Sequence, residues 1–147
     1  MNLLAPVSEI MKTKLVTVSP NDSIEDVRQI FQKHRIHHLP VVHNGELVGM
    51  LSLSDYKLFS HDSDPDIYDR FIEEVRRKNF KVRDIMIDRI ATLEPDDRVN
   101  VALEVFRENR FHALPVIDKD RALLGIVTTF DIVDFLARDQ KAEMTYK

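Results

Sequence analysis

Apolar residues along the chain recur with two spacings, and their alternation predicts short strands followed by amphipathic helices. Leu15 to Val18 is a brief β-branched run, and the apolar positions 24, 27, 30 and 31 after it have helical spacing. Leu39 to His43 and Leu47 to Ser52 are further apolar runs, joined by Asn44-Gly45, which tolerate the positive φ of a tight hairpin turn. With a helix after the hairpin, the pattern predicts strand, helix, strand, strand, helix.

The whole pattern occurs twice. A shift of 75 positions carries Ile10-Met11 onto Ile85-Met86 and Leu39-Pro40-Val41 onto Leu114-Pro115-Val116. The helical stripe of the second copy consists of Val99, Ala102, Val105 and Phe106. We therefore expect an α+β fold made of two copies of one unit, which places equivalent polar groups in two related clefts.

Polar residues mark where the first helix of each copy begins. Asp22 is the predicted cap in the first copy, with Glu25 three residues later, and Asp97 is its counterpart in the second. The two hairpin loops differ, because Asp118 to Arg121 is longer than Asn44-Gly45 and lacks glycine. We expect a wider turn there.

Boundaries follow from the breaks between these patterns. We assign residues 1–62 to the first copy, 63–80 to a helical linker and 81–147 to the second copy with a short polar tail. The linker follows a break at His61 to Pro65, and Ile67 to Arg77 is amphipathic, with an apolar stripe expected to pack across the two halves. The tail after Leu136 is polar and expected to fray.

Composition narrows the class of protein. The 147 residues are 44% hydrophobic and 31% charged, which is ordinary for a soluble globular domain. The absence of cysteine excludes disulfides and thiol catalysis, and with no targeting or membrane segment the cytoplasm is the default location. A formal net charge of −4 disfavours a general nucleic-acid binder, since such binding rests on basic side chains.

Each copy ends its hairpin in one small motif, Gly49-Met-Leu-Ser52-Leu-Ser54-Asp55 and Gly125-Ile-Val-Thr128-Thr129-Phe130-Asp131. The carboxylate can accept hydrogen bonds from ribose hydroxyls, while the Ser or Thr hydroxyl and the amides of a helix start can donate to phosphate. Ordinary helix capping explains a single copy equally well. Its occurrence twice, in equivalent places, favours a ribosyl phosphate site.

These motifs together resemble the paired CBS domains, named after cystathionine beta-synthase and also called the Bateman module. The resemblance covers about Val7 to Leu136 and suggests a stand-alone pair without a catalytic domain. It rests on Ile10-Met11 and Ile85-Met86, Thr17-Val-Ser-Pro20 and Thr92-Leu-Glu-Pro95, His37-His-Leu-Pro-Val41 and His112-Ala-Leu-Pro-Val116, and the two Gly-to-Asp motifs.

The resemblance implies a regulatory module that senses an adenine nucleotide (AMP, ADP or ATP) or another adenosyl compound, in clefts between two β-α-β-β-α repeats about a pseudo-two-fold axis. It also implies that the first strand and helix are hydrogen-bonded across the pair, that the protein is a homodimer, and that another protein partner reads the signal. One cleft would contain Ser52, Ser54, Asp55, Ile90, Ala91, Phe111 and His112. The other would contain Thr128, Asp131, Lys14, Leu15, Val16, Ile36 and His37.

Departures from the family pattern refine this expectation. Members that bind di- and triphosphates often have Arg where this chain has His38 and Ala113, which favours AMP over ATP. Phe130 replaces the second hydroxyl, that of Ser54, so we expect unequal clefts, with the Asp55 cleft the more polar.

Other functional classes stay open. His34, His37, His38 and His43 suggest a metal site, but adjacent strand residues point to opposite faces, so His37 and His38 cannot easily share an ion. No histidine is locally placed to activate Ser52 or Thr128, so we expect neither an enzyme nor a catalytic cofactor. The remaining alternatives are a protein-docking or structural CBS pair without nucleotide, and a binder of S-adenosylmethionine.

Overall fold

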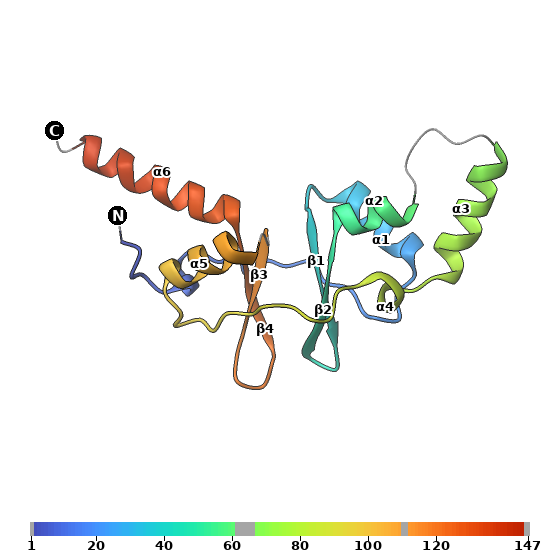
Figure 1. The fold of residues 1–147 in the computed structure, drawn as a ribbon, viewed down its shortest axis with the longest axis horizontal. Helices are drawn as coiled ribbons and strands as arrows, with labels where there is room; N and C mark the ends of the chain where they lie inside the picture. Colours follow the sequence, from blue (N-terminus) through green and yellow to red (C-terminus); the bar gives the residue numbers. More distant parts are fainter. Residues whose placement is uncertain (1, 61–66, 110–111, 146–147) are drawn as a thin grey trace. The chain divides into compact units, whose positions relative to one another are not determined.

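The computed structural model describes residues 2–60, 67–109 and 112–145, which divide into two compact units (Figure 1). The central unit is Val16–Ile90. The terminal unit combines Met1–Leu15 with Ala91–Lys147. Each unit therefore contains one hairpin and the segment that precedes the other copy of the repeat.

In the central unit, helices pack against a two-stranded antiparallel sheet. The strands β1 (His38–His43) and β2 (Glu46–Ser52) are joined by Asn44 and Gly45, whose φ angles of 51° and 79° match the predicted turn. The helices are α1 (Ile24–Lys33), α2 (Leu53–Ser60), α3 (Ile67–Asn79) and the short α4 (Val82–Ile85). The core comprises Val18, Ile24, Val27, Leu39, Val41, Leu51, Tyr56 and Val82.

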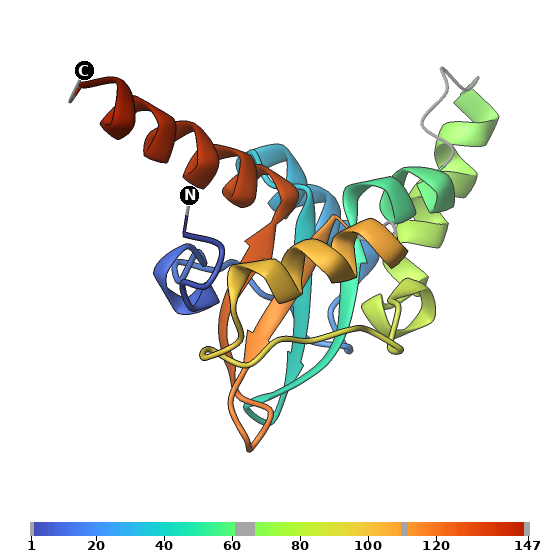
Figure 2. The same ribbon diagram turned by 60° about the vertical axis from the view of Figure 1, so that its left-hand side comes forward.

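The terminal unit repeats this arrangement (Figure 2). A short 3-10 helix (Val7–Glu9) is followed by α5 (Val99–Asn109), β3 (Ala113–Ile117), β4 (Leu123–Thr128) and α6 (Thr129–Thr145). Both hairpins are antiparallel and both carry an irregularity near the end of their first strand, so the sequence repeat is also a structural one. The core comprises Ala5, Val7, Leu93, Val99, Ala102, Phe106, Leu114, Val116, Val127 and Ile132.

The first predicted strand of each copy is reduced to a single parallel bridge. Val18 exchanges two backbone hydrogen bonds with the Pro40 carbonyl and the Val42 amide, at 3.1 and 2.8 Å. Leu93 does the same beside β3. The expectation of hydrogen bonds across the pair is therefore wrong for the first strand, because Val18 and Leu93 stay with their own hairpins. It is confirmed at the helix start, where the Val99 amide of α5 donates to the Ala5 carbonyl of the other copy at 2.9 Å.

The segment that precedes the first bridge of each copy is also hydrogen-bonded to the other copy. Lys12 pairs with Ile126 on β4 through hydrogen bonds of 2.9 and 3.0 Å, and Ile87 pairs with Met50 on β2 through two of 2.9 Å. A Cβ on Gly125 would lie 2.6 Å from the Met11 sulfur, which explains why glycine stands where the segment crosses the hairpin.

The predicted cap of α1 is wrong by one position. The side chain that caps α1 is Ser23, which accepts a hydrogen bond from the Asp26 amide at 3.1 Å, while Asp26 caps back onto the Ser23 amide. Asp22 instead accepts from the Ser19 amide at 2.8 Å, and Asp97 from the Glu94 amide at 2.8 Å. Each aspartate therefore accepts from the amide three residues earlier and closes the turn that precedes the helix.

The wider turn expected at residues 118–121 is present. The Asp118 carboxylate accepts hydrogen bonds from the amides of Asp120 and Ala122, at 2.8 and 2.9 Å, and so closes the loop. Arg121 has a φ of 64°, a conformation that glycine would adopt with less strain.

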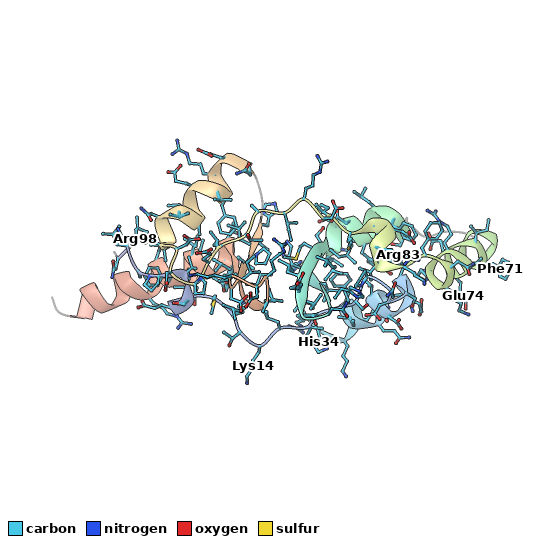
Figure 3. The ribbon with its side chains drawn as sticks, turned by 90° about the horizontal axis from the view of Figure 1, so that it is seen from below. Lys14, His34, Phe71, Glu74, Arg83 and Arg98 are labelled. Atoms are coloured by element: carbon cyan, nitrogen blue, oxygen red, sulfur yellow. The ribbon has the colours of Figure 1, made fainter. Side chains whose placement is uncertain are left out.

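The predicted linker helix is present as α3, and its packing across the two halves stays a prediction. Arg77 of α3 pairs with Glu25 of α1 at 3.1 Å, so a polar edge joins the two helices. The apolar residues Phe71, Ile72 and Val75 are exposed, and Figure 3 shows Phe71 projecting outward from α3. The break at residues 61–65 lies outside the described residues.

The C-terminal tail does not fray at Leu136, since α6 continues to Thr145. The residues after Leu136 include no glycine or proline, and an ion pair between Arg138 and Asp134 at 2.8 Å supports the helix at i and i+4. Within the described residues, no helix has the length and apolarity to cross a membrane.

Candidate functional site

In the central unit the Gly-to-Asp motif forms a capping box where β2 passes into α2. The Ser52 hydroxyl accepts a hydrogen bond from the Asp55 amide at 3.0 Å, and the Asp55 carboxylate accepts one from the Ser52 amide at 3.4 Å. Both side chains are half-buried, and Ser54 is exposed. Capping uses only Oδ2 of Asp55, so acceptor sites remain for another donor.

The terminal unit has the same box where β4 passes into α6. The Thr128 hydroxyl accepts from the Asp131 amide at 3.2 Å, and Oδ2 of Asp131 accepts from the Thr128 amide and hydroxyl at 2.8 and 2.9 Å. Asp131 is buried, with 8% of its surface exposed. Both motifs therefore cap the helix that follows them. Capping does not exclude ligand binding, because each carboxylate has a second oxygen.

Among the described residues, a cation lies beside only one of the two carboxylates. Lys12 Nζ lies 3.5 Å from Oδ1 of Asp131 and 5.9 Å from the centre of the exposed Phe130 ring. In the described part of the chain, Asp55 has no ion pair. The two motifs are thus unequal in charge as well as in sequence.

Each motif lies beside the histidine stretch of its own unit. The His37 carbonyl accepts a hydrogen bond from the Leu53 amide at 2.8 Å, and the His112 carbonyl accepts one from the Thr129 amide at 3.2 Å. Both histidine side chains are exposed. Imidazoles can therefore approach an anion near either helix start without a burial cost.

Both predicted clefts draw on residues of the two units. In the cleft of Asp55, Ile90 belongs to the central unit, Ala91 and His112 to the terminal unit, and Phe111 lies outside the described residues. In the cleft of Asp131, the terminal unit supplies Lys14 and Leu15, whereas the central unit supplies Val16, Ile36 and His37. The two groupings stay predictions, and among their members the structure joins Ser52 to Asp55 and Thr128 to Asp131.

Sequence reasoning missed Lys12. The signal was present, because the 75-residue shift places Lys12 on Ile87 directly after the shared Ile-Met pairs. A charged residue in one copy and an apolar one in the other marks a place where the copies differ in chemistry.

A metal centre has no support from the histidines. Among the described side chains, no group of three or more His, Cys, Asp or Glu residues could hold an ion. Their environments differ, since His34 and His38 are half-buried whereas His37 and His43 are exposed.

Comparison with known proteins identifies the repeat. The model of the CBS domain matches residues 7–60 and 82–138. An uncharacterized protein of Methanocaldococcus jannaschii is 30% identical over 152 aligned positions, which cover 88% of this chain and 90% of the relative.

Solved structures have the same fold. CBSX2 of Arabidopsis thaliana, in complex with AMP, has a TM-score of 0.76 and 24% identity, over 92% of this chain and 98% of that one. The CBS domain pair of the protein MJ0100, in complex with 5′-methylthioadenosine and S-adenosyl-L-methionine, has a TM-score of 0.74 and 25% identity over the same shares.

Proposed function

We propose, from the premise that this chain belongs to the CBS domain family, that it is a regulatory module which binds an adenosyl ligand and catalyses no reaction. The observation that carries the proposal is the doubled capping box, Ser52 with Asp55 and Thr128 with Asp131. A single box is a cap. Two boxes at equivalent helix starts are two equivalent places for a ribosyl phosphate.

The chemistry of the ligand follows from the groups around each box. The aspartate accepts hydrogen bonds from the ribose hydroxyls, and the positive end of the α2 or α6 helix dipole favours a phosphate. His37 and His112 would approach that phosphate. His38 and Ala113 stand where the family often has Arg, so a single phosphate is better matched than three and we propose AMP as the preferred ligand.

A thioadenosyl ligand is the second candidate. The specific observation in its favour is that the MJ0100 pair, at 25% identity, holds methylthioadenosine and S-adenosylmethionine. These ligands share the adenosyl group with AMP but carry no phosphate. The histidines separate the two cases, because they serve a phosphate and have little to offer a thioether.

Calorimetric titration of the purified, nucleotide-stripped protein tests the proposal. We expect saturable binding of AMP, weaker binding of ATP, and loss of both in the double variant Asp55→Ala, Asp131→Ala. Asp84→Ala is the matched control, since Asp84 also caps a helix, through the Lys81 amide at 2.8 Å, but lies outside both motifs. Retained AMP binding in the double variant would refute the role of the two aspartates.

The histidines have their own test. His37→Ala or His112→Ala should weaken AMP more than adenosine, whereas His43→Ala, at the exposed far end of β1, should change neither. Equal losses for AMP and adenosine would remove the phosphate role. Binding of S-adenosylmethionine alone would establish the thioadenosyl candidate instead.

We also propose that the module is a homodimer whose ligand changes how a protein partner binds. Large apolar side chains are exposed on the helices that cover both sheets, with 76% of Leu58, 65% of Phe130 and 61% of Val133 accessible. A second copy would remove such surface from water. Sedimentation of Val133→Asp should show a monomer, and Val75→Asp on α3 should leave the dimer intact; a monomeric unmodified protein would end this part of the proposal.

A further inference from the structure

Lys12 and Ile87 occupy equivalent places in the two units. Each directly follows a methionine that packs on a hairpin glycine, Met11 on Gly125 and Met86 on Gly49. Each also exchanges two backbone hydrogen bonds with the second hairpin strand. Backbone geometry is therefore matched, and the side chain is the difference.

The difference between Lys12 and Ile87 changes the charge near the two aspartates that are proposed to bind ribose. In the terminal unit, the Lys12 ammonium lies 3.5 Å from Oδ1 of Asp131 and over the Phe130 ring. In the central unit the corresponding side chains are those of Ile87 and Ser54, neither of which carries a charge. No cation among the described residues pairs with Asp55.

The acceptor capacity of the two carboxylates differs as a result. Oδ2 of Asp131 accepts two hydrogen bonds and Oδ1 faces Lys12, so both oxygens have partners. Oδ2 of Asp55 accepts one long bond of 3.4 Å, and Oδ1 has no partner within the described residues. A ribose diol needs two acceptor positions, and Asp55 offers them without displacing a cation.

We propose that Lys12 sets the order in which the two motifs take a ligand, so that the adenosyl ribose occupies Asp55 first and Asp131 only after Lys12 has moved away. This inference rests on the proposed function. Lys12 acts as a positioning residue, because it works through Asp131 and not through a contact of its own with the ligand. The chain thereby has a high-affinity and a low-affinity site made from the same motif.

The expected size of the effect is modest. The Lys12 side chain is 59% exposed and that of Asp131 only 7%, so the pair is partly screened by water. Half-exposed ion pairs contribute up to about 1 kcal/mol, which corresponds to an affinity change of about fivefold. Displacing Lys12 should therefore weaken ribose binding at Asp131 by about three- to fivefold.

Exchanging the two residues tests the inference, with adenosine and AMP as titrants. In an Asp55→Ala background, which leaves only the Asp131 motif, Lys12→Ile should tighten adenosine binding by about three- to fivefold, and Lys12→Arg should not. In an Asp131→Ala background, Ile87→Lys should weaken adenosine binding by a similar factor. Lys12→Met, which keeps most of the length of the side chain without its charge, repeats the measurement if the isoleucine variant melts early.

Each outcome decides between the alternatives. Unchanged or weaker adenosine binding in Lys12→Ile and Lys12→Met overturns the inference while the proposed function stands. Weaker AMP binding with unchanged adenosine binding assigns Lys12 to the phosphate instead, and also overturns it. If the unmodified protein binds neither adenosine nor AMP, the proposed nucleotide function fails and the inference with it.

Discussion

Replacing Gly125 by alanine should detach the crossing segment from β4. The added Cβ would lie 2.6 Å from the Met11 sulfur, 2.9 Å from Met11 Cγ and 2.9 Å from the Lys12 carbonyl oxygen. Met11 is half-buried and can rotate, but the Lys12 carbonyl is fixed by its 3.0 Å hydrogen bond from the Ile126 amide. The backbone contact is therefore the one that costs stability.

The magnitude follows from three contributions to the free energy of unfolding. Overpacking typically costs about 1–3 kcal/mol. Loss of the backbone hydrogen bond adds about 1 kcal/mol, and the lower entropy of the unfolded alanine chain returns about 0.4–1 kcal/mol. The net loss of about 2 kcal/mol should lower the melting temperature by about 4–8 °C in a chain of this size.

Circular dichroism during heating is the assay, with Gly49→Ala as the matched control. Its Cβ would lie 2.8 Å from the Met86 sulfur but 3.1 Å from the Ile87 carbonyl, so the backbone needs to yield less and the loss should be smaller. Met11→Ala should not rescue Gly125→Ala, because it removes only the side-chain obstacle. A Gly125→Ala variant that melts at or above the unmodified protein, or a rescue by Met11→Ala, would refute the reasoning.

Three further changes test the packing and the boxes. Leu39→Ala removes a fully buried side chain and should cost about 2–5 kcal/mol in urea unfolding; a loss below 1 kcal/mol would contradict its place in the core. Asp131→Ala should cost about 1–2 kcal/mol, more than Asp55→Ala, because its bonds are shorter and more numerous; the reverse order of melting temperatures would count against the geometry. Glu25→Gln should cost at most about 1 kcal/mol, through its ion pairs with Arg77 and Arg28, and the loss should shrink in high salt; a salt-independent loss would point to packing.

Much of the fold can be predicted from the sequence, because the two copies of the repeat match at many positions. Asn44-Gly45 predicted the tight turn, and the shift to the second copy predicted its wider counterpart at 118–121. The cap was predicted at Asp22 and lies at Ser23, since both residues are competent caps and only the turn geometry decides between them.

Which glycine each Ile-Met pair packs on is a harder question. Gly49 and Gly125 are equivalent in pattern, so periodicity alone does not distinguish packing within a copy from packing across copies. Periodicity also does not show that Lys12 lies near Asp131, because this contact depends on the pairing of the N-terminal segment with β4. The two boxes and the difference between Lys12 and Ile87 were readable in advance, but the contact of Lys12 with Asp131 was not, because the two residues are more than a hundred positions apart.

The crossing segment also dictates an order of events during protein synthesis. The central unit is continuous, so its residues have all left the ribosome soon after Ile90 is added, whereas Lys12 finds its partner only after Ile126 has been made. At typical elongation rates of about 5–20 residues per second, the N-terminal segment waits for on the order of ten seconds with Val7 and Met11 exposed. A nascent chain stalled before β4 would therefore have a folded central unit and an N-terminal segment with exposed apolar side chains. That segment could bind chaperones or the β4 strand of another copy.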